Sequence, residues 1–436
     1  MQTTIQNKIF GTDSKISLLK EENMEQKIKY QYSYFIYPYI IDENKYDKYL
    51  LKLLKDKHCK LKLWEKEKDL NVYTYFLPNV RDYLFWSFSY NNEKKRKLEE
   101  LDTDMKSVLL SKYPCTMFEY TLGKEVQAKV GEENGIFFDI QKIDIICFKT
   151  GVCFLLLKTI IEGENNFSDV LNFNYKFRDI NSEFISLKNY ENIRLQTSSL
   201  KDIKELSSVI KNITGPNTDA KEMNLEEERF LTYSYVCLEQ LNWSKEEDFA
   251  NLQDEFMKFS NILPSNYQVN YSEERYKKQV LQPLKYTKIG ITKQGTALLT
   301  SSIYSENYTK LPFSYEQEYL YTYILALYKK IYLKKMNLEF KRTNNFEKTR
   351  EKLLDFTRNI WIQEVTEDDV GSMLYEKWKE TLELEYLYAE IKNKYDMVYK
   401  DLNIEKSRRT NYLIIAVLVG SLLFNVVNFV MLYLGR

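Results

Sequence analysis

The sequence predicts an α+β cytoplasmic region with antiparallel hairpins and many helices, followed by a long C-terminal helix that continues into a single transmembrane helix. Two apolar stretches, 136–161 and 288–301, each turn at a glycine, which is typical of β-hairpins. Helix-period patterns dominate the later part of the chain. The run 412–434 has 23 residues and no charge, and is therefore long enough to cross a bilayer.

The composition argues against several classes of function. Lys plus Arg and Asp plus Glu each number 63, and this neutral balance argues against direct binding of nucleic acid. The single histidine, His58, excludes most zinc sites and most histidine-based catalysis. The cysteines are odd in number and lack C-x-x-C spacing, so we expect reduced, mostly buried thiols of a cytoplasmic protein. They are Cys59, Cys115, Cys147, Cys153 and Cys237.

The first 120 residues are expected to form a loose N-terminus, 1–26, and a small α/β region, 27–120. The N-terminus has no apolar core of a signal peptide. Pro78 near the start of an aromatic segment favours a helix there. The expected elements follow a βαβ-like order: a strand at 27–41, a helix at 42–54, a strand at 61–64 and the aromatic segment at 76–88.

An α+β cytoplasmic domain is expected over 121–310. In its first hairpin Gly151 supplies the positive φ that a tight turn needs, and the apolar density indicates a central position in the sheet. The second hairpin turns around Lys293-Gln294-Gly295. The sequence leaves open whether the two hairpins share a sheet. Between them we expect helices at 225–241 and 243–260, after a loop at 215–217.

A helical region is expected over 311–365 and a stalk helix over 366–411. Ser314 with Gln317 forms the pattern of a capping box and predicts a helix start. A further helix is expected at 346–364. Thr366 with Asp369 is expected to cap one uninterrupted helix that runs through the stalk into the membrane.

The stalk contains a seam of large side chains at heptad spacing. Such a seam packs either on the protein's own helices or on another copy of the chain, and the sequence does not decide between them. Glu390 and Lys394 add an i,i+4 pair on another face. The seam comprises Leu384, Tyr388, Ile391, Tyr395, Val398 and Leu402.

The transmembrane helix, Tyr412–Leu434, is expected to place a single pass in the cell membrane. The basic residues Lys406, Arg408 and Arg409 precede it, and such clusters remain on the cytoplasmic side. The N-terminal bulk would therefore lie in the cytoplasm, anchored by its C-terminus, with the lipid bilayer as a partner. The alternative is a buried helix of a soluble core.

The transmembrane helix carries a polar stripe on one face. Asn residues deep in lipid are costly unless they find hydrogen-bond partners, and a single membrane helix offers none within its own chain. We therefore expect this face to meet copies of itself or to line a pore, giving a homo-oligomer. The alternative is that the asparagines are merely tolerated. The stripe comprises Val417, Gly420, Ser421, Asn425 and Asn428.

Motifs for catalysis or cofactors are absent from the sequence. It has no Walker A loop, no G-x-G-x-x-G and no G-x-S-x-G, so we expect no enzyme, no catalytic residues, no metal and no cofactor. Two basic segments have functional interpretations. The run 91–97 is either a patch for phosphate or lipid head groups or a solvated helix end, and Lys176 with Arg178 holds either an anionic ligand or structural salt bridges.

The cytoplasmic α/β part, the long helix and the C-terminal membrane end together resemble the CorA cation-transporter superfamily, over about residues 120–436. Here one membrane helix is expected and the family's Gly-Met-Asn signature is absent, so no selectivity residue is carried over. The chain looks like the divergent CorA-like proteins found beside type III CRISPR systems. That resemblance implies a ring-shaped oligomer, a small nucleotide-type ligand and a role in antiviral defence.

Three hypotheses for the function follow. The first is an oligomeric membrane effector or channel whose cytoplasmic domain senses a ligand and alters membrane permeability. The second is a tail-anchored binding or scaffold module in which the membrane helix is only an anchor. The third is a membrane-bound enzyme of unfamiliar type, which requires a pocket that the linear sequence hides.

Overall fold

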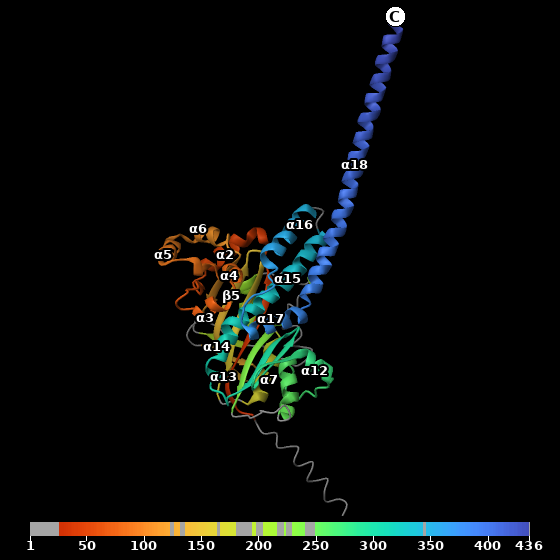
Figure 1. Ribbon diagram of the computed structural model, residues 1–436. Coiled ribbons are helices and arrows are strands. Elements are labelled where there is room, and N and C mark those ends of the chain that lie inside the picture. Colours follow the sequence, from red (N-terminus) through yellow and green to blue (C-terminus); the bar gives the residue numbers. More distant parts are fainter. Residues whose placement is uncertain are drawn as a thin grey trace, which may run out of the picture. The chain divides into compact units, whose positions relative to one another are not determined.

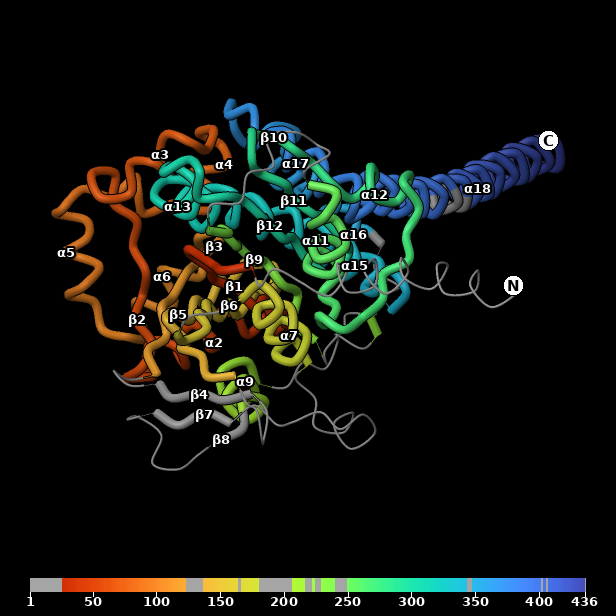
Figure 2. Tube along the Cα trace, turned by 90° about the horizontal axis from the view of Figure 1, so that it is seen from below, coloured from red at the N-terminus to blue at the C-terminus, as the bar shows by residue number. Residues whose placement is uncertain are grey.

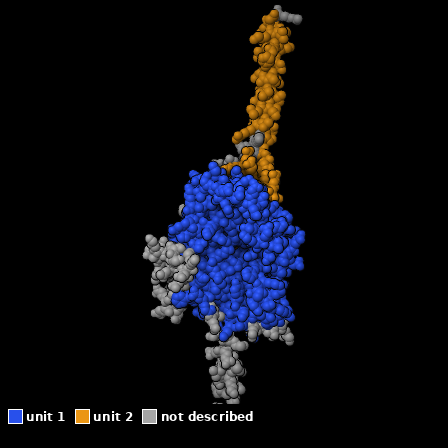
Figure 3. Space-filling view, turned by 90° about the vertical axis from the view of Figure 1, so that its left-hand side faces the viewer, with its two compact units in different colours: residues 1–325, 364–381 blue, residues 326–363, 382–436 orange. Residues whose placement is uncertain are grey.

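The computed structural model of the chain divides into two compact units (Figures 1 and 3). Unit 1 comprises residues 1–325 and 364–381, and unit 2 comprises 326–363 and 382–436. The structure describes residues 26–122, 126–130, 136–163, 166–179, 194–197, 204–215, 222–223, 229–239, 249–342 and 346–435.

Unit 1 is built on a mixed sheet that has twelve strands within the described residues. Ten of them follow the order β10-β11-β12-β9-β1-β6-β5-β4-β7-β8, while β3 pairs with β5 and β2. Only β12 and β9 are parallel among these described pairs. The strands are β1 (Ile28–Ile40), β2 (Cys59–Leu61), β3 (Cys115–Tyr120), β4 (Val126–Val130), β5 (Ile136–Phe148), β6 (Val152–Ile161), β7 (Arg194–Thr197), β8 (Lys204–Glu205), β9 (Leu231–Leu238), β10 (Val280–Leu284), β11 (Thr287–Thr292) and β12 (Gly295–Ser301).

The two expected hairpins lie in this one sheet, which answers the question that the sequence left open. Strands β5 and β6 pair antiparallel and turn at Gly151, whose φ is 82°. Strands β11 and β12 pair antiparallel across Lys293 and Gln294. Strand β6 lies between β1 and β5, so the first hairpin is central in the sheet.

Strand β1 lies at the centre of the sheet, so the βαβ-like layer expected over 27–120 is wrong. It pairs antiparallel with β6 on one edge and β9 on the other, while β2 pairs with β3. The last ten residues of β1 are all buried. A strand buried along most of its length needs neighbours on both edges, and these come from later parts of the chain.

Strand β9 replaces part of the helix expected over 225–241. Seven of its eight residues are buried, and its sequence LTYSYVCL is rich in β-branched and aromatic side chains that suit a central strand. Of the helix expected over 243–260, the described part contains the 3-10 turn η3 (Ala250–Leu252) and α11 (Gln253–Asn261). Most of the expected loop at 215–217 lies outside the described residues.

The two faces of the sheet pack against different helices (Figure 2). Phe35 of β1 packs on Phe177 of α7 (Phe167–Phe177), with ring centroids 4.2 Å apart. Tyr34, the residue of β1 directly before Phe35, points to the opposite face, where its hydroxyl donates to Glu316. Because successive side chains of a strand alternate, one strand joins both helical layers to the sheet.

The helices of the first 215 residues cover the sheet around its N-terminal strands. Pro78 stands in the first turn of α4, as the sequence predicts, and the run 91–97 forms the start of α5, capped by the Asn91 side chain. The elements are η1 (Glu43–Lys45), α2 (Tyr46–Lys55), α3 (Leu70–Tyr75), α4 (Pro78–Leu84), η2 (Trp86–Ser89), α5 (Asn92–Glu100), α6 (Thr103–Leu110) and α9 (Leu206–Thr214).

A continuous helical segment follows the last strand and corrects the expected start at Ser314. The helix already begins at Leu311, because Pro312 suits a first turn, and Ser314 has helical φ and ψ of −60° and −42° without capping through its side chain. The segment passes through a π-helix, η4. Its elements are α14 (Leu311–Ser314), η4 (Tyr315–Tyr319) and α15 (Leu320–Arg342). Two short helices come earlier in the chain: α12 (Glu273–Gln279) before β10 and α13 (Glu306–Thr309) after β12.

The expected uninterrupted stalk helix is wrong, because two helices share this stretch. Helix α17 (Asp369–Thr381) belongs to unit 1 and α18 (Leu384–Leu434) to unit 2. They are separated at Glu383, whose φ of 58° is left-handed and ends a helix. The cap of α17 is Asp368, whose carboxylate accepts from the Gly371 amide at 2.6 Å, in place of the expected Thr366. Helix α16 (Phe346–Asp355) continues into the π-helix η5 (Phe356–Ile360).

Candidate functional site

Helix α18 contains the one candidate membrane span among the described residues. The segment Ser407–Leu434 has 28 residues, a mean hydropathy of 2.5 and no burial within the chain. The whole helix has 51 residues and is therefore about 75 Å long. Its second half is long and apolar enough to cross a bilayer, while its first half belongs to the packed part of unit 2.

The predicted polar stripe lies on the exposed surface of this span. Ser421 donates its hydroxyl to the Leu418 carbonyl at 2.9 Å, the usual local bond of a serine in a helix. Gly420 has no atom within 4 Å of where a Cβ would stand. Asn425 and Asn428 are exposed, and neither carboxamide has a partner among the described residues. The span thus presents two strong hydrogen-bonding groups on one side.

The predicted seam of the stalk packs within unit 2. Leu384, Ile391 and Tyr395 are buried, and the Tyr395 ring meets Phe340 of α15 at 4.9 Å. These contacts correspond to the intrachain alternative that the sequence left open.

Tyr388 of the seam packs on Trp361 and on the π-helix η5. Its ring stacks on Trp361 with centroids 4.4 Å apart, and its hydroxyl is 3.0 Å from the Thr357 hydroxyl in η5. Val398 is half-buried, and the side chain of Leu402 lies outside the described residues. The pair Glu390–Lys394 is present as the sequence predicts.

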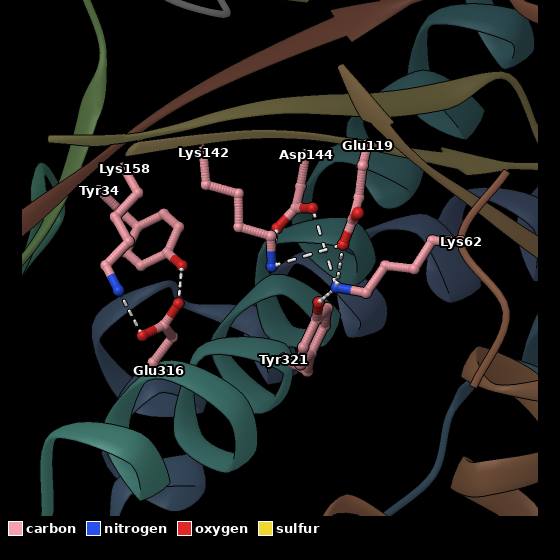
Figure 4. A network of polar contacts seen from close by, with 8 residues as sticks. All are labelled: Tyr34, Lys62, Glu119, Lys142, Asp144, Lys158, Glu316 and Tyr321. Atoms are coloured by element: carbon pink, nitrogen blue, oxygen red, sulfur yellow. Dashed lines mark hydrogen bonds and ion pairs between the residues drawn. The ribbon is translucent and has the colours of Figure 1, made fainter. Parts of the chain in front are cut away.

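A network of charged side chains lies between the sheet and the start of α15 in unit 1 (Figure 4). The Lys158 ammonium of β6 is 2.6 Å from one carboxylate oxygen of Glu316, and the Tyr34 hydroxyl donates to the other oxygen at 2.6 Å. Burial raises the pKa of Tyr34 well above its ordinary value, and the Glu316 charge adds to the shift, so the hydroxyl remains a donor. Both oxygens of Glu316 are therefore held by the sheet.

The second half of the network centres on Lys62, just after β2. Its ammonium donates to the Tyr321 hydroxyl of α15 at 3.0 Å and lies 3.8 Å from Asp144 and 3.9 Å from Glu119. Lys142 pairs with Asp144 at 3.1 Å. Figure 4 shows Lys142, Asp144 and Glu119 pointing from the strands towards the helix that carries Tyr321.

The network fixes the π-helix η4 to the sheet and carries no recognisable chemistry. Its cations, Lys62, Lys142 and Lys158, balance three carboxylates, so no excess charge is left for an ionic substrate. Within the described residues no group of three or more His, Cys, Asp or Glu side chains could hold a metal ion. A π-turn adds a residue to the helix, and it persists only where packing and hydrogen bonds hold it.

Sequence reasoning missed this network, although the chain contains a signal for it. Lys158 is the one charged residue of strand β6, VCFLLLKTII, and both it and Asp144 of β5 are buried. Buried charges need partners, so a lone charge in an apolar strand predicts an ion pair across the core. The sequence does not reveal which partner it finds.

Arg178, one of the two basic residues of the predicted anionic-ligand site, has structural partners. The Arg178 guanidinium is buried, donates to the Gln294 side chain at 2.9 Å and lies 3.8 Å from Asp179. Asp179 also accepts from Arg229 at 2.8 Å. Lys176 is half-buried in the last turn of α7. These contacts match the structural salt bridges that the sequence left as the alternative.

The cysteines and the histidine carry no site of their own. All five cysteines are free and buried, as expected from their number and spacing. Burial raises the pKa of Cys59 to about 12, so this thiol stays protonated and unreactive. The ring of His58 lies beside Tyr120 at 5.9 Å.

Glu318→Gln is expected to raise the free energy of unfolding at pH 7 and to lose this benefit in acid. Burial raises the pKa of the Glu318 carboxyl, a bond from Ser314 opposes the shift, and the Asp368 carboxylate adds to it. The folded chain then holds the proton more tightly than the unfolded chain, so the ionised group costs stability, and the cost fades as pH falls through the raised pKa. Denaturation at pH 7 and at about pH 4 measures it; the same gain at both would contradict the assignment.

No known protein family, curated protein or solved structure matches this chain. The function must therefore be inferred from the residues themselves.

Proposed function

We propose that this protein is a tail-anchored, homo-oligomeric membrane effector or channel, with its N-terminal bulk in the cytoplasm. One observation carries the proposal: the apolar span of α18 bears Asn425 and Asn428 on one face, without partners in the described chain. A carboxamide in hydrocarbon loses its hydrogen bonds to water. A second copy of the same helix supplies donors and acceptors at the same depth.

The energetics favour association through this face. Hydrogen bonds between side chains of membrane helices contribute about 0.6–2 kcal/mol each. Several copies around one axis would form such bonds repeatedly and leave their polar faces inside. Gly420 and Ser421 are small and allow close approach of backbones on the same side.

The charges flanking the span support the proposed orientation. Lys406, Arg408 and Arg409 directly precede it. Positive charges are retained on the cytoplasmic side, so the part before the span would remain in the cytoplasm.

The order of elements supports a relationship to CorA-like proteins. A sheet-containing unit is followed by paired helices and then by a long helix that enters the apolar span. This order favours a divergent CorA-like effector in antiviral defence. Such an effector would be opened by a small nucleotide-type ligand. The missing Gly-Met-Asn signature separates it from Mg²⁺ transport.

A tail-anchored binding or scaffold module is the second candidate. The observation that favours it is the packing of the stalk seam on α15 and α16, because Leu384, Ile391 and Tyr395 are then unavailable for self-association. In this case the span of α18 anchors the protein and its asparagines are tolerated.

Replacing both asparagines by leucine is expected to dissociate the oligomer. The variant Asn425→Leu/Asn428→Leu removes the hydrogen bonds that hold the copies together while it keeps an apolar helix that inserts. The mass of the detergent-solubilised protein, by light scattering or native mass spectrometry, and leakage of a dye from proteoliposomes measure the effect. The matched control Asn425→Gln/Asn428→Gln keeps both carboxamides and should keep the assembly.

The same experiment separates the two candidates. A defined oligomer that becomes monomeric in the leucine variant, together with loss of leakage, supports the effector. If the wild-type protein is already monomeric, the channel hypothesis is excluded, since one helix cannot enclose a pore. The tail-anchored module is then the remaining candidate.

A further inference from the structure

Unit 2 is strongly basic although the whole chain is neutral. It contains 17 Lys and Arg residues against 10 Asp and Glu, a net charge of +7, and unit 1 therefore has a net charge of −7. Such asymmetry between two parts of a chain is typical of proteins that bind a polyanionic surface.

Contacts of α16 with α18 define the direction of α16 in unit 2. Thr357 lies in the π-helix η5, which continues α16, and its hydroxyl contacts that of Tyr388. The Arg350 guanidinium of α16 lies 4.1 Å from the centre of the Tyr399 ring. Earlier residues of α16 thus meet later residues of α18, so the two helices are antiparallel. The first turn of α16 therefore lies at its end nearest the membrane segment.

The end of helix α15 lies beside the start of α16. Lys329 donates to the Ile362 carbonyl at 2.8 Å, and Lys352 pairs with Glu339 at 2.9 Å, so α15 and α16 are antiparallel. The end of α15 and the start of α16 therefore form one tip on the membrane side of unit 2. This tip carries four exposed cations: Lys341, Arg342, Lys348 and Arg350.

The tip lies within electrostatic reach of a lipid surface. Arg350 is level with Tyr399, which stands 13 residues, or about 20 Å, before the uncharged run that begins at Tyr412. The first residue of α16, Phe346, is about 6 Å nearer. The remaining distance of roughly 14 Å includes a head-group layer of about 5–8 Å. The gap is comparable with the screening length of about 8 Å at physiological ionic strength.

We propose that this basic tip, Lys341, Arg342, Lys348 and Arg350, binds the head groups of anionic phospholipids. The inference rests on the membrane anchoring proposed above and adds a specific surface and partner to it. Arg408 and Arg409 at the start of the span extend the same positive surface to the bilayer. An anionic surface that attracts unit 2 repels unit 1, whose net charge is negative. The lipid surface thus attracts unit 2 and not unit 1.

The tip variant Lys341→Gln/Arg342→Gln/Lys348→Gln tests the proposal in the full chain. It keeps Arg350, which packs on Tyr399. The protein is inserted in nanodiscs of phosphatidylcholine with about one third phosphatidylglycerol, and native mass spectrometry counts the lipids it retains. One basic residue near an anionic surface is worth roughly fivefold in binding. Enrichment of phosphatidylglycerol should fall at least about fivefold in this variant and in high salt.

A matched control removes three exposed positive charges from one helix of unit 1. Arg275→Gln/Lys277→Gln/Lys278→Gln on α12 changes the net charge equally and should leave the enrichment unchanged. If both variants insert and enrich phosphatidylglycerol equally, the basic tip is not the lipid-binding surface, while the proposed membrane anchoring stands. Failure of the wild type to insert overturns both. If the tip instead retains an added oligonucleotide with no preference for phosphatidylglycerol, nucleic acid is the partner and the proposal is wrong.

Discussion

Lys158→Met is expected to lower the free energy of unfolding of unit 1 by about 3 kcal/mol, because it leaves a buried carboxylate without its cation. The Lys158 and Glu316 side chains are only 10% and 16% exposed, and their atoms are 2.6 Å apart. The Tyr34 hydroxyl alone cannot neutralise the Glu316 charge. Chemical denaturation of the detergent-solubilised chain, followed by circular dichroism, measures the loss.

An exposed ion pair of similar geometry provides the control. Lys310 pairs with Glu306 at 2.9 Å, and these side chains are 77% and 69% exposed. Lys310→Met should cost less than about 0.5 kcal/mol, since water replaces the partner. The double variant Lys158→Met/Glu316→Leu removes both charges and should recover much of the loss. If Lys158→Met cost no more than Lys310→Met, the network would not hold the helix to the sheet.

The local pattern of the sequence predicts much of the sheet but not its order. The hairpin around Gly151 follows from two apolar strands and one residue that tolerates positive φ. The sequence predicts a helix where β9 lies, because a short apolar run has no periodicity that separates a buried strand from a helix. Its neighbours β1 and β12 come from distant parts of the chain, and only they make it a strand.

The break in the stalk was also beyond the sequence pattern. Residues 368–434 contain no proline and keep helical periodicity, yet Glu383 adopts a left-handed conformation that usually belongs to glycine. The cause is tertiary: Leu382 and Leu384 on either side are both buried. Burying both requires the chain to turn between them. Packing therefore outweighed the local preference of Glu383 for a right-handed helix.

The candidate sites differ in how far the sequence predicts them. The membrane span and its asparagines depend only on residues adjacent in one helix, so hydropathy and spacing suffice. The charge network joins Lys62, Asp144 and Glu316 from three distant segments. The basic tip required knowledge that α15 and α16 are antiparallel. Sites built by long-range contacts become visible only when those contacts are known.

Trp378→Ala is expected to lower the free energy of unfolding of unit 1 by about 3–5 kcal/mol. Trp378 of α17 is fully buried, its indole nitrogen donates to the Thr296 hydroxyl of β12 at 2.9 Å, and its ring lies 5.2 Å from Tyr323. Truncation leaves a large cavity and removes a hydrogen bond at the point where α17 packs on the sheet. Circular dichroism at 222 nm avoids a fluorescence signal that the substitution itself alters.

The conservative variant separates packing from hydrogen bonding at this position. Trp378→Phe keeps most of the ring contacts with Tyr323 and loses the bond to Thr296, so it should cost about 1–2 kcal/mol. Helix α17 is the last element of unit 1 before α18, and Trp378 is its largest fully buried side chain. If the alanine variant kept wild-type stability, α17 would not be fixed to the sheet. A loss limited to the expected range, with the phenylalanine variant between, shows that the packing of this one side chain holds α17 on the sheet.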